Sequence, residues 1–237
     1  MNADSRSWSQ TQFSNHKEGV EPAGRTRDPT QVTQRDSTPP APAEGGVNPA
    51  AALLLTLRGQ PTLYYGDELA LQETNVPPED QQDPWGIRVP GMSRDGCRSP
   101  MPWTPGPGHG FTGPGIKPWL GFGEDAETRN VETQLSDDGS MLNLIRHLLA
   151  LRRRRPSLHR GTLAFLDAAP DDVLSYVRQV DGEQSTVLIN FSSATRTVTV
   201  SSTAKVLAST DGASLLAGAS VSLAPHAAMV LDTGPDS

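Results

Sequence analysis

Residues 48–68 read NPAAALLLTLRGQPTLYYGDE and predict a buried helix that leads directly into a buried strand. Asn48 before a proline is typical of a helix start, and Gly59 is typical of a helix end. The short apolar and aromatic run 61–65 predicts the strand, which Gly66 ends. A helix joined closely to a strand is half of a βαβ unit, as found in a parallel sheet or barrel. In an α/β barrel, the residues just after a strand line the functional face.

The next tract, residues 69–138, is irregular and rich in proline and glycine. Loops of this length are either functional or disordered. The tract contains Trp85, Trp103 and Trp119, which are three of the four tryptophans. This favours an ordered loop that packs or binds something. A flexible linker is the alternative.

A second helix is predicted where residues 137–156 read DDGSMLNLIRHLLALRRRRP. Its apolar residues recur at helical spacing, and Asp138 or Ser140 can cap its start. The run Arg152 to Arg155 suits the negative end of the helix dipole. We interpret this run as a solvated helix end rather than a phosphate or nucleic-acid patch.

From Gly161 onward the apolar residues recur with a period of two, which predicts strands. Asp181-Gly182 and Asp211-Gly212 provide turn signals between the runs. The expected strands lie within DVLSYVRQV, STVLINFSS, ATRTVTVSS, AKVLAS, ASVSLAPH and AAMVLDT. Short strands at this spacing predict a small antiparallel β-sandwich. The fold class is therefore α/β plus all-β.

The first 46 residues contain few apolar side chains and show no lasting period. Such a composition buries too little apolar surface to offset its ordering entropy, so we expect a disordered or degenerate arm. The predicted organisation is this arm at 1–46, a helix-strand-loop-helix segment at 47–156 and the β-sandwich at 157–233.

Composition excludes several classes of function. The formal net charge of −7 argues against nucleic acid as the main partner. No run approaches 18 apolar residues and no apolar leader opens the chain, so we expect a cytoplasmic protein without a membrane span. One cysteine, Cys97, excludes an internal disulfide and is expected to be a small buried packing residue.

No zinc-type spacing of cysteine and histidine occurs, and the glycine-rich residues 106–115 follow no strand. We therefore expect no cofactor and no metal. The adjacent carboxylates of Asp67 and Glu68 are expected to make supporting hydrogen bonds or cap a helix, because neighbouring residues on an extended chain point in opposite directions.

Three segments carry a resemblance to glycoside hydrolase family 13, the amylase-type enzymes. LLLTLRGQPTLYYGDEL (53–69) resembles the seventh helix and eighth strand of the family's barrel. DPWGIRVPGMSRDGCRSPMPW (83–103) is similar to the loop after strand eight in α-glucosidases and oligo-1,6-glucosidases, and LINFSS (188–193) resembles a strand of the C-terminal β-domain. The resemblance covers roughly residues 47–232. It implies the terminal portion of a (β/α)8 barrel followed by a small antiparallel β-sandwich.

The resemblance also implies a set of substrate-binding residues. Tyr65 would lie at the barrel mouth, and Arg98 would shape the aglycone side of the pocket, with a structural salt bridge as the alternative role for Arg98. WSQTQFSNHK (8–17) resembles the segment after strand seven, where His16 would bind substrate. Lys17 stands where the family has an aspartate, which implies a defective site.

In the family, a carboxylate nucleophile and a carboxylic acid come from strands four and five, so no catalytic residue is assigned here. The expected function is that of a fragment of a retaining α-glucosidase that acts on α-glucosides and short maltooligosaccharides. We expect it to be inactive as an isolated chain and to need a missing upstream barrel segment. The alternatives are a non-catalytic carbohydrate-binding or interaction module and a degenerate remnant.

Overall fold

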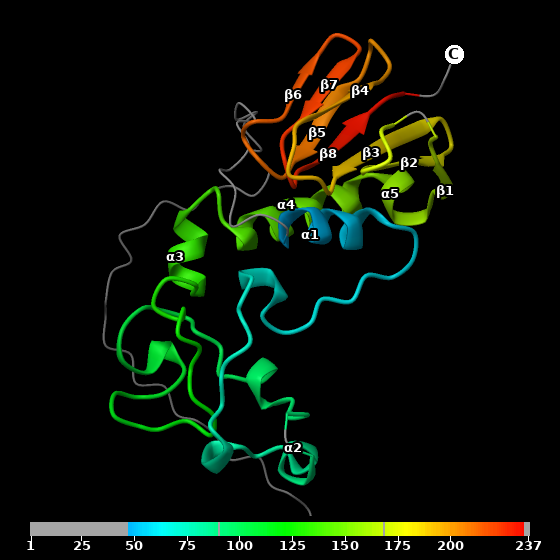
Figure 1. Ribbon diagram of the computed structural model, residues 1–237. Coiled ribbons are helices and arrows are strands. Elements are labelled where there is room, and N and C mark those ends of the chain that lie inside the picture. The colour runs from blue at the N-terminus through cyan, green and yellow to red at the C-terminus, as the bar shows by residue number, and fades with distance from the viewer. Residues whose placement is uncertain (1–46, 90, 168, 235–237) are drawn as a thin grey trace, which may run out of the picture. The chain divides into compact units, whose positions relative to one another are not determined.

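The computed structural model describes residues 47–89, 91–167 and 169–234 of the chain (Figure 1). Its helices are α1 (Val47–Thr56), α2 (Pro84–Arg88), α3 (Val131–Ser136), α4 (Met141–Arg154) and α5 (Pro156–Arg160). Short 3₁₀ turns are η1 (Asp67–Leu69), η2 (Pro78–Asp80), η3 (Asp95–Cys97) and η4 (Pro107–Gly110). None of the helices in these residues is long and apolar enough to cross a membrane.

The C-terminal strands form two antiparallel sheets, as the sequence predicted. They are β1 (Thr162–Phe165), β2 (Val173–Val180), β3 (Glu183–Asn190), β4 (Arg196–Thr199), β5 (Lys205–Ser209), β6 (Leu215–Ala217), β7 (Ser220–Leu223) and β8 (Ala228–Asp232). The larger sheet has the order β1-β2-β3-β8-β5 and the smaller one β4-β7-β6. The short strands β1 and β6 were not among the predicted runs.

The larger sheet is covered on both faces. Tyr176, Val187 and Val230 share one buried cluster with residues of α1 and α4, so these helices lie against this face (Figure 1). Alternate residues on the same strands, such as Leu188 and Leu231, pack with the smaller sheet. Since successive side chains of a strand point to opposite faces, the period-two pattern places one set on the helices and the other in the sandwich.

The β2–β3 hairpin follows from an Asp-Gly signal. Asp181 and Gly182 have φ values of 46° and 78°, and Val180 pairs with Glu183. Two consecutive residues with positive φ match the right-handed twist of the flanking strands. The turn therefore sets the register of the sheet's longest pair.

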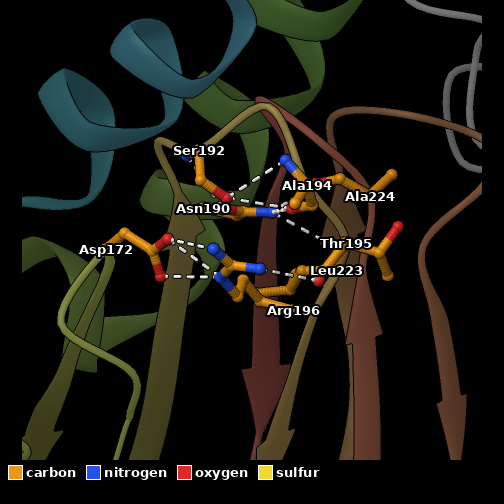
Figure 2. A network of polar contacts seen from close by, with 8 residues as sticks. All are labelled: Asp172, Asn190, Ser192, Ala194, Thr195, Arg196, Leu223 and Ala224. Carbon is orange, nitrogen blue, oxygen red and sulfur yellow. Dashed lines mark hydrogen bonds and ion pairs between the residues drawn. The ribbon is translucent and has the colours of Figure 1, made fainter.

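Asn190 anchors the loop after β3 within the LINFSS segment, as Figure 2 shows. Its buried side-chain amide donates to the carbonyls of Ala194 and Ala224, both at 2.8 Å. Its Oδ1 accepts hydrogen bonds from the Ser192 backbone N–H and hydroxyl. Beside it, the Arg196 guanidinium binds both oxygens of Asp172 (Figure 2). Asn190 therefore connects the end of β3 to the β3–β4 and β7–β8 loops, and Arg196 connects β4 to the β1–β2 loop.

The prediction that the arginine run is solvated is wrong for Arg152. Its side chain is buried and donates to the carbonyls of Leu55, Leu57 and Gly59 at the end of α1. Arg153 and Arg154 are exposed, as predicted, but the prediction also fails for Arg155, which is partly buried and forms ion pairs with Glu183 and Asp232. Arg152 follows Leu148 by four residues and therefore lies on the buried face of α4.

The predicted strand at 61–65 does not form. A parallel strand requires hydrogen bonds from neighbouring strands, and the described residues provide none for this segment. The prediction of Asn48 as a helix cap is also wrong, because α1 begins at Val47. The buried Asn48 amide donates to the carbonyl of Thr210 at 3.2 Å and so links α1 to the sandwich.

Ser140 caps α4, which confirms one of the two predicted residues. Its hydroxyl accepts a hydrogen bond from the Asn143 backbone N–H at 3.2 Å. The same hydroxyl donates to the carbonyl of Gln134, which lies in the last turn of α3. This cap therefore also fixes the junction between α3 and α4.

Candidate functional site

The Tyr-Tyr-Gly-Asp-Glu segment forms a tight turn. Gly66 has a φ of 92°, a conformation that suits glycine. The Asp67 carboxylate accepts from the Tyr64 N–H at 2.7 Å, and the Glu68 carboxylate accepts from the Gly66 N–H at 3.0 Å. Both carboxylates thus bind local backbone, which agrees with the expectation that they make supporting hydrogen bonds.

Tyr65 links this turn to the following loop. Its phenol donates a hydrogen bond to the carbonyl of Ser99. Partial burial, together with the nearby charge of Glu68, raises the pKa of Tyr65 to about 12. The phenol therefore stays protonated at neutral pH and acts as a hydrogen-bond donor.

Asp83 and Arg94 form an ion pair within the loop at residues 83–103. The Arg94 Nε and Nη2 atoms each lie 2.8 Å from an oxygen of Asp83, which is a bidentate geometry. Asp83 also caps α2 by accepting from the Trp85 N–H. The hydrogen bonds from Arg94 hold the pKa of Asp83 well below its usual range. The Asp83 carboxyl is thus held in its ionised form.

Asp95 has a similar structural role. One of its oxygens accepts from the N–H groups of Gln82 and Asp83, at 2.7 and 2.9 Å, and from the Ser93 hydroxyl. Burial opposes ionisation, but these hydrogen bonds outweigh it and lower the pKa of Asp95. The loop therefore closes around two ionised carboxylates.

An open pocket of about 760 Å³ lies between this loop and the Tyr65 turn. We call it the aromatic pocket. Its lining comprises Tyr64, Tyr65, Gln82, Asp83, Pro84, Asp95, Cys97, Arg98, Ser99, Pro100, Met101, Phe111, Trp119 and Leu120. The Trp119 side chain is 76% exposed. Apolar walls with a few polar groups are typical of small-molecule sites.

Phe111 enters the pocket from the glycine-rich loop. Its ring contacts Phe122 edge-to-face with ring centres 6.2 Å apart, and Phe122 in turn contacts His109 at 4.5 Å. His109 has a φ of 46° between two glycines that also have positive φ. This loop of residues with positive φ therefore positions an aromatic wall of the pocket.

The structure brings together two of the three predicted substrate-binding residues. Tyr65 and Arg98 both line the aromatic pocket. Arg98 is exposed and makes no ion pair with another residue of the described ranges. Their roles toward substrate stay predictions. His16 lies outside the described residues. Cys97 is exposed, so the prediction of a buried packing residue is wrong, because the η3 turn directs it outward.

Sequence reasoning did not assign Phe111, Trp119 or the two aspartates to the site. One signal was present, since the tryptophan-rich tract was expected to be ordered and to pack or bind something. Trp85 and Trp103 belong to the same tract but do not line the pocket. Only the folded loop distinguishes Trp119 from these two. Within the described ranges, no cluster of three metal-ligating side chains occurs.

Comparison with known proteins gives a consistent result. The family model described as alpha amylase, catalytic domain, matches residues 31–161, more than half of the chain. A probable alpha-glucosidase of Rhizobium meliloti is 38% identical over 144 residues, which cover 60% of this chain and 26% of that protein. The trehalose synthase/amylase TreS of Mycobacterium tuberculosis is 35% identical over 147 residues, 58% of this chain and 22% of that one. The chain thus spans about a quarter of the length of these relatives.

Solved structures give the same picture. The alpha-glucosyl transfer enzyme XgtA matches with a TM-score of 0.68 and 35% identity, over 78% of this chain and 35% of that one. Trehalulose synthase MutB from Pseudomonas mesoacidophila MX-45 matches with a TM-score of 0.68 and 25% identity, over 79% of this chain and 38% of that one. The described residues therefore form the terminal portion of a (β/α)8 barrel followed by a β-sandwich.

Proposed function

This chain belongs to the alpha-amylase family, glycoside hydrolase family 13, and on that premise we propose that its aromatic pocket binds α-glucosides and short maltooligosaccharides. The relatives named alpha-glucosidase and alpha-glucosyl transfer enzyme bear names that refer to glucosides or glucosyl groups. The proposed ligand class follows from this shared feature and from the chemistry of the pocket.

The observation that carries the proposal is the combination of aromatic and polar groups in one pocket. Trp119, Phe111 and Tyr64 present partly exposed rings, and a sugar ring has apolar C–H faces that can pack on them. Arg98 offers several N–H donors at the same pocket, which suit the hydroxyl groups of a sugar. A volume of about 760 Å³ accommodates more than one sugar ring.

In this proposal Tyr65 and Arg98 contact the substrate, and His16 supplies a further contact. Tyr65 already donates to the Ser99 carbonyl, so its phenol oxygen has lone pairs left to accept from a sugar hydroxyl. The Arg98 guanidinium has no partner among the described residues, and its planar fork can reach two adjacent hydroxyls.

Maltotriose titration of the full chain by calorimetry tests the proposal. We expect Trp119→Ala to weaken binding about tenfold or more, because an aromatic anchor is lost. Trp85→Ala is the matched control, since Trp85 is also an exposed tryptophan of the same tract but does not line the pocket. Equal effects of the two substitutions, or no binding by the parent chain, would refute the proposal.

We also propose that the chain binds sugar without hydrolysing it when isolated. A retaining glycosidase needs a carboxylic acid with a raised pKa to protonate the leaving group. The carboxyl groups that line the pocket belong to Asp83 and Asp95, and hydrogen bonds lower both pKa values. Neither is suited to donate a proton. This supports the non-catalytic binding module as the second candidate function for the isolated chain.

Hydrolysis of an aryl α-glucoside by the purified chain is the direct test. We expect no release of the aryl alcohol above the level of a mock purification. Activity that copurifies with the chain and disappears in Asp83→Asn would contradict the proposal.

We further propose that barrel elements outside the described residues supply the nucleophile and the acid. Residues Ala50, Leu54, Leu63, Met141 and Ile145 line a second, largely apolar pocket of about 350 Å³, which suits contact with such elements. Adding the barrel portion of the Rhizobium meliloti relative should restore hydrolysis if the proposal holds. A cytoplasmic location is part of the same proposal and is tested by cell fractionation.

A further inference from the structure

The space between the two sheets is not uniformly apolar. Near Val173 and Leu188 the sandwich interior is an ordinary apolar cluster. Farther along the same faces of β2 and β3 the residues become polar: Ser175, Gln184 and Thr186 are all buried. Buried polar side chains in a sandwich interior are unusual and call for a specific reason.

These residues line a pocket of about 180 Å³, which we call the sandwich pocket. Its other walls come from the β1–β2 loop, from residues 198–201 of β4 and its continuation, and from Thr233. Hydroxyls of Thr199 and Ser201 complete a lining in which polar groups face valine and leucine side chains. The sandwich pocket shares no residue with the aromatic pocket.

Most of the polar groups in the sandwich pocket already have partners. The Ser175 hydroxyl donates to the carbonyl of Leu166 at 2.8 Å. The hydroxyls of Thr186 and Thr233 lie 3.0 Å apart and share a hydrogen bond. Each of these hydroxyls retains unused capacity, because a hydroxyl has one donor and two acceptor positions.

Gln184 differs from them. The residue is only 8% exposed, yet its side-chain amide forms no hydrogen bond with any other described residue. The hydrogen bonds at this residue go to its backbone carbonyl, from Arg155 and from the Thr233 N–H. The amide atoms are not among the fully buried side-chain atoms without a partner, so they remain accessible from the pocket, and a group that enters it can pair with them.

We propose that the sandwich pocket binds one monosaccharide ring. The Gln184 amide offers both a donor and an acceptor, which is the pairing that a sugar hydroxyl requires. Valine and leucine side chains of the pocket suit the C–H face of a ring. The volume corresponds to about six waters at ~30 Å³ each, below the range for larger ligands, so an oligosaccharide does not fit. This inference does not depend on the function of the aromatic pocket.

The test is an NMR titration of the isotope-labelled full chain with D-glucose. We expect saturable shifts of the Gln184 side-chain NH₂ signals, with a Kd in the millimolar range, about 1–10 mM for so small a ligand. Maltotriose should not shift these signals. Trp119→Ala, which alters the aromatic pocket, should leave the glucose affinity for the sandwich pocket unchanged.

Two substitutions should weaken glucose binding at least tenfold. Gln184→Met removes the amide at nearly constant size, and Ala169→Leu fills the pocket from the loop. Gln179→Met is the matched control, because Gln179 pairs directly with Gln184 across the β2–β3 ladder but is exposed. Because the Gln184 amide has no hydrogen-bond partner among the described residues and keeps contact with solvent, Gln184→Met should leave the thermal midpoint without sugar nearly unchanged.

Several results would overturn the proposal. These are the absence of saturable shifts at Gln184, equal glucose affinity in Gln184→Met and the parent, or shifts confined to the Tyr65–Trp119 region. A clear drop in the thermal midpoint of Gln184→Met would also overturn it, since the amide would then have a structural partner. Loss of maltotriose binding in Trp119→Ala tests only the aromatic pocket, so the two sites fail independently.

Discussion

Removal of the Arg178 side chain should destabilise the fold strongly. Arg178 on β2 is fully buried, and its guanidinium donates to the carbonyls of Thr56, Gly161 and Thr162 at 2.5, 3.1 and 3.1 Å. Burial, followed by the nearby charge of Arg152, lowers the pKa of Arg178. The described residues provide no carboxylate for it, so carbonyl dipoles stabilise this charge.

Arg178→Met keeps much of the side-chain volume but leaves three carbonyl groups without donors. Hydrogen bonds to charged groups contribute about 1.5–3 kcal/mol each, and removal of the buried charge returns part of its desolvation cost. We expect a net loss of about 3 kcal/mol in the free energy of unfolding. With an m-value of ~2–3 kcal/mol/M, the urea midpoint should fall by about 1–1.5 M.

Urea unfolding followed by circular dichroism measures this shift. Arg153→Met is the matched control, because Arg153 is an exposed arginine on α4 and its loss should change stability by no more than ~0.5 kcal/mol. The double substitution Arg152→Met/Arg178→Met should cost about 1 kcal/mol more than the sum of the single ones, because each single substitution relieves the repulsion between the two like charges and the double one relieves it only once. Equal midpoints for Arg178→Met and Arg153→Met would refute the reasoning, and so would strict additivity.

Three further substitutions test other parts of the structure. Asn190→Ala should lower the free energy of unfolding by about 2–3 kcal/mol, because it removes the amide that binds the carbonyls of Ala194 and Ala224; calorimetry that shows an unchanged Tm would contradict this. Gly96→Ala should cost about 1–3 kcal/mol, because its Cβ would lie 2.7 Å from the Thr74 carbonyl oxygen; a neutral result in urea would show that the loop adapts. Asp232→Asn should weaken the loss of the free energy of unfolding as the pH falls into the acid range. The hydrogen bond from Arg155 lowers the pKa of Asp232 in the fold, so its contribution is present above the unfolded pKa of about 4 and is lost as pH falls through the folded value. If the free energy of unfolding falls equally with pH in parent and variant, the Arg155–Asp232 pair does not make this contribution.

The sequence predicted the sandwich well because its signals are local. The Asp181-Gly182 dipeptide specifies a hairpin by backbone conformation alone, and alternation along β2 and β3 reflects two buried faces. The edge strands β1 and β6 were missed because most of their residues are exposed, so that no buried face imposes an alternating pattern on them.

The errors have a common cause in tertiary contacts. The run 61–65 has the composition of a strand but lacks neighbouring strands among the described residues. Arg152 was assigned to solvent by its charge, although its position four residues after Leu148 places it on the buried face. The pocket itself was only partly predictable. Tyr65 and Arg98 came from a motif, whereas Trp119 reaches the pocket through the path of a long loop, which no local pattern encodes.

The bonds from Arg178 to the end of α1 also have a consequence for synthesis on the ribosome. The Arg178–Thr56 hydrogen bond joins residues 122 positions apart. At ~5–20 residues per second, translation needs roughly 6–24 s to add that length. Until Arg178 is made, the Thr56 carbonyl lacks its guanidinium partner, and the apolar face of α1 has no sheet to cover it. A nascent chain that has reached α4 but not β2 should therefore be the form most dependent on chaperones.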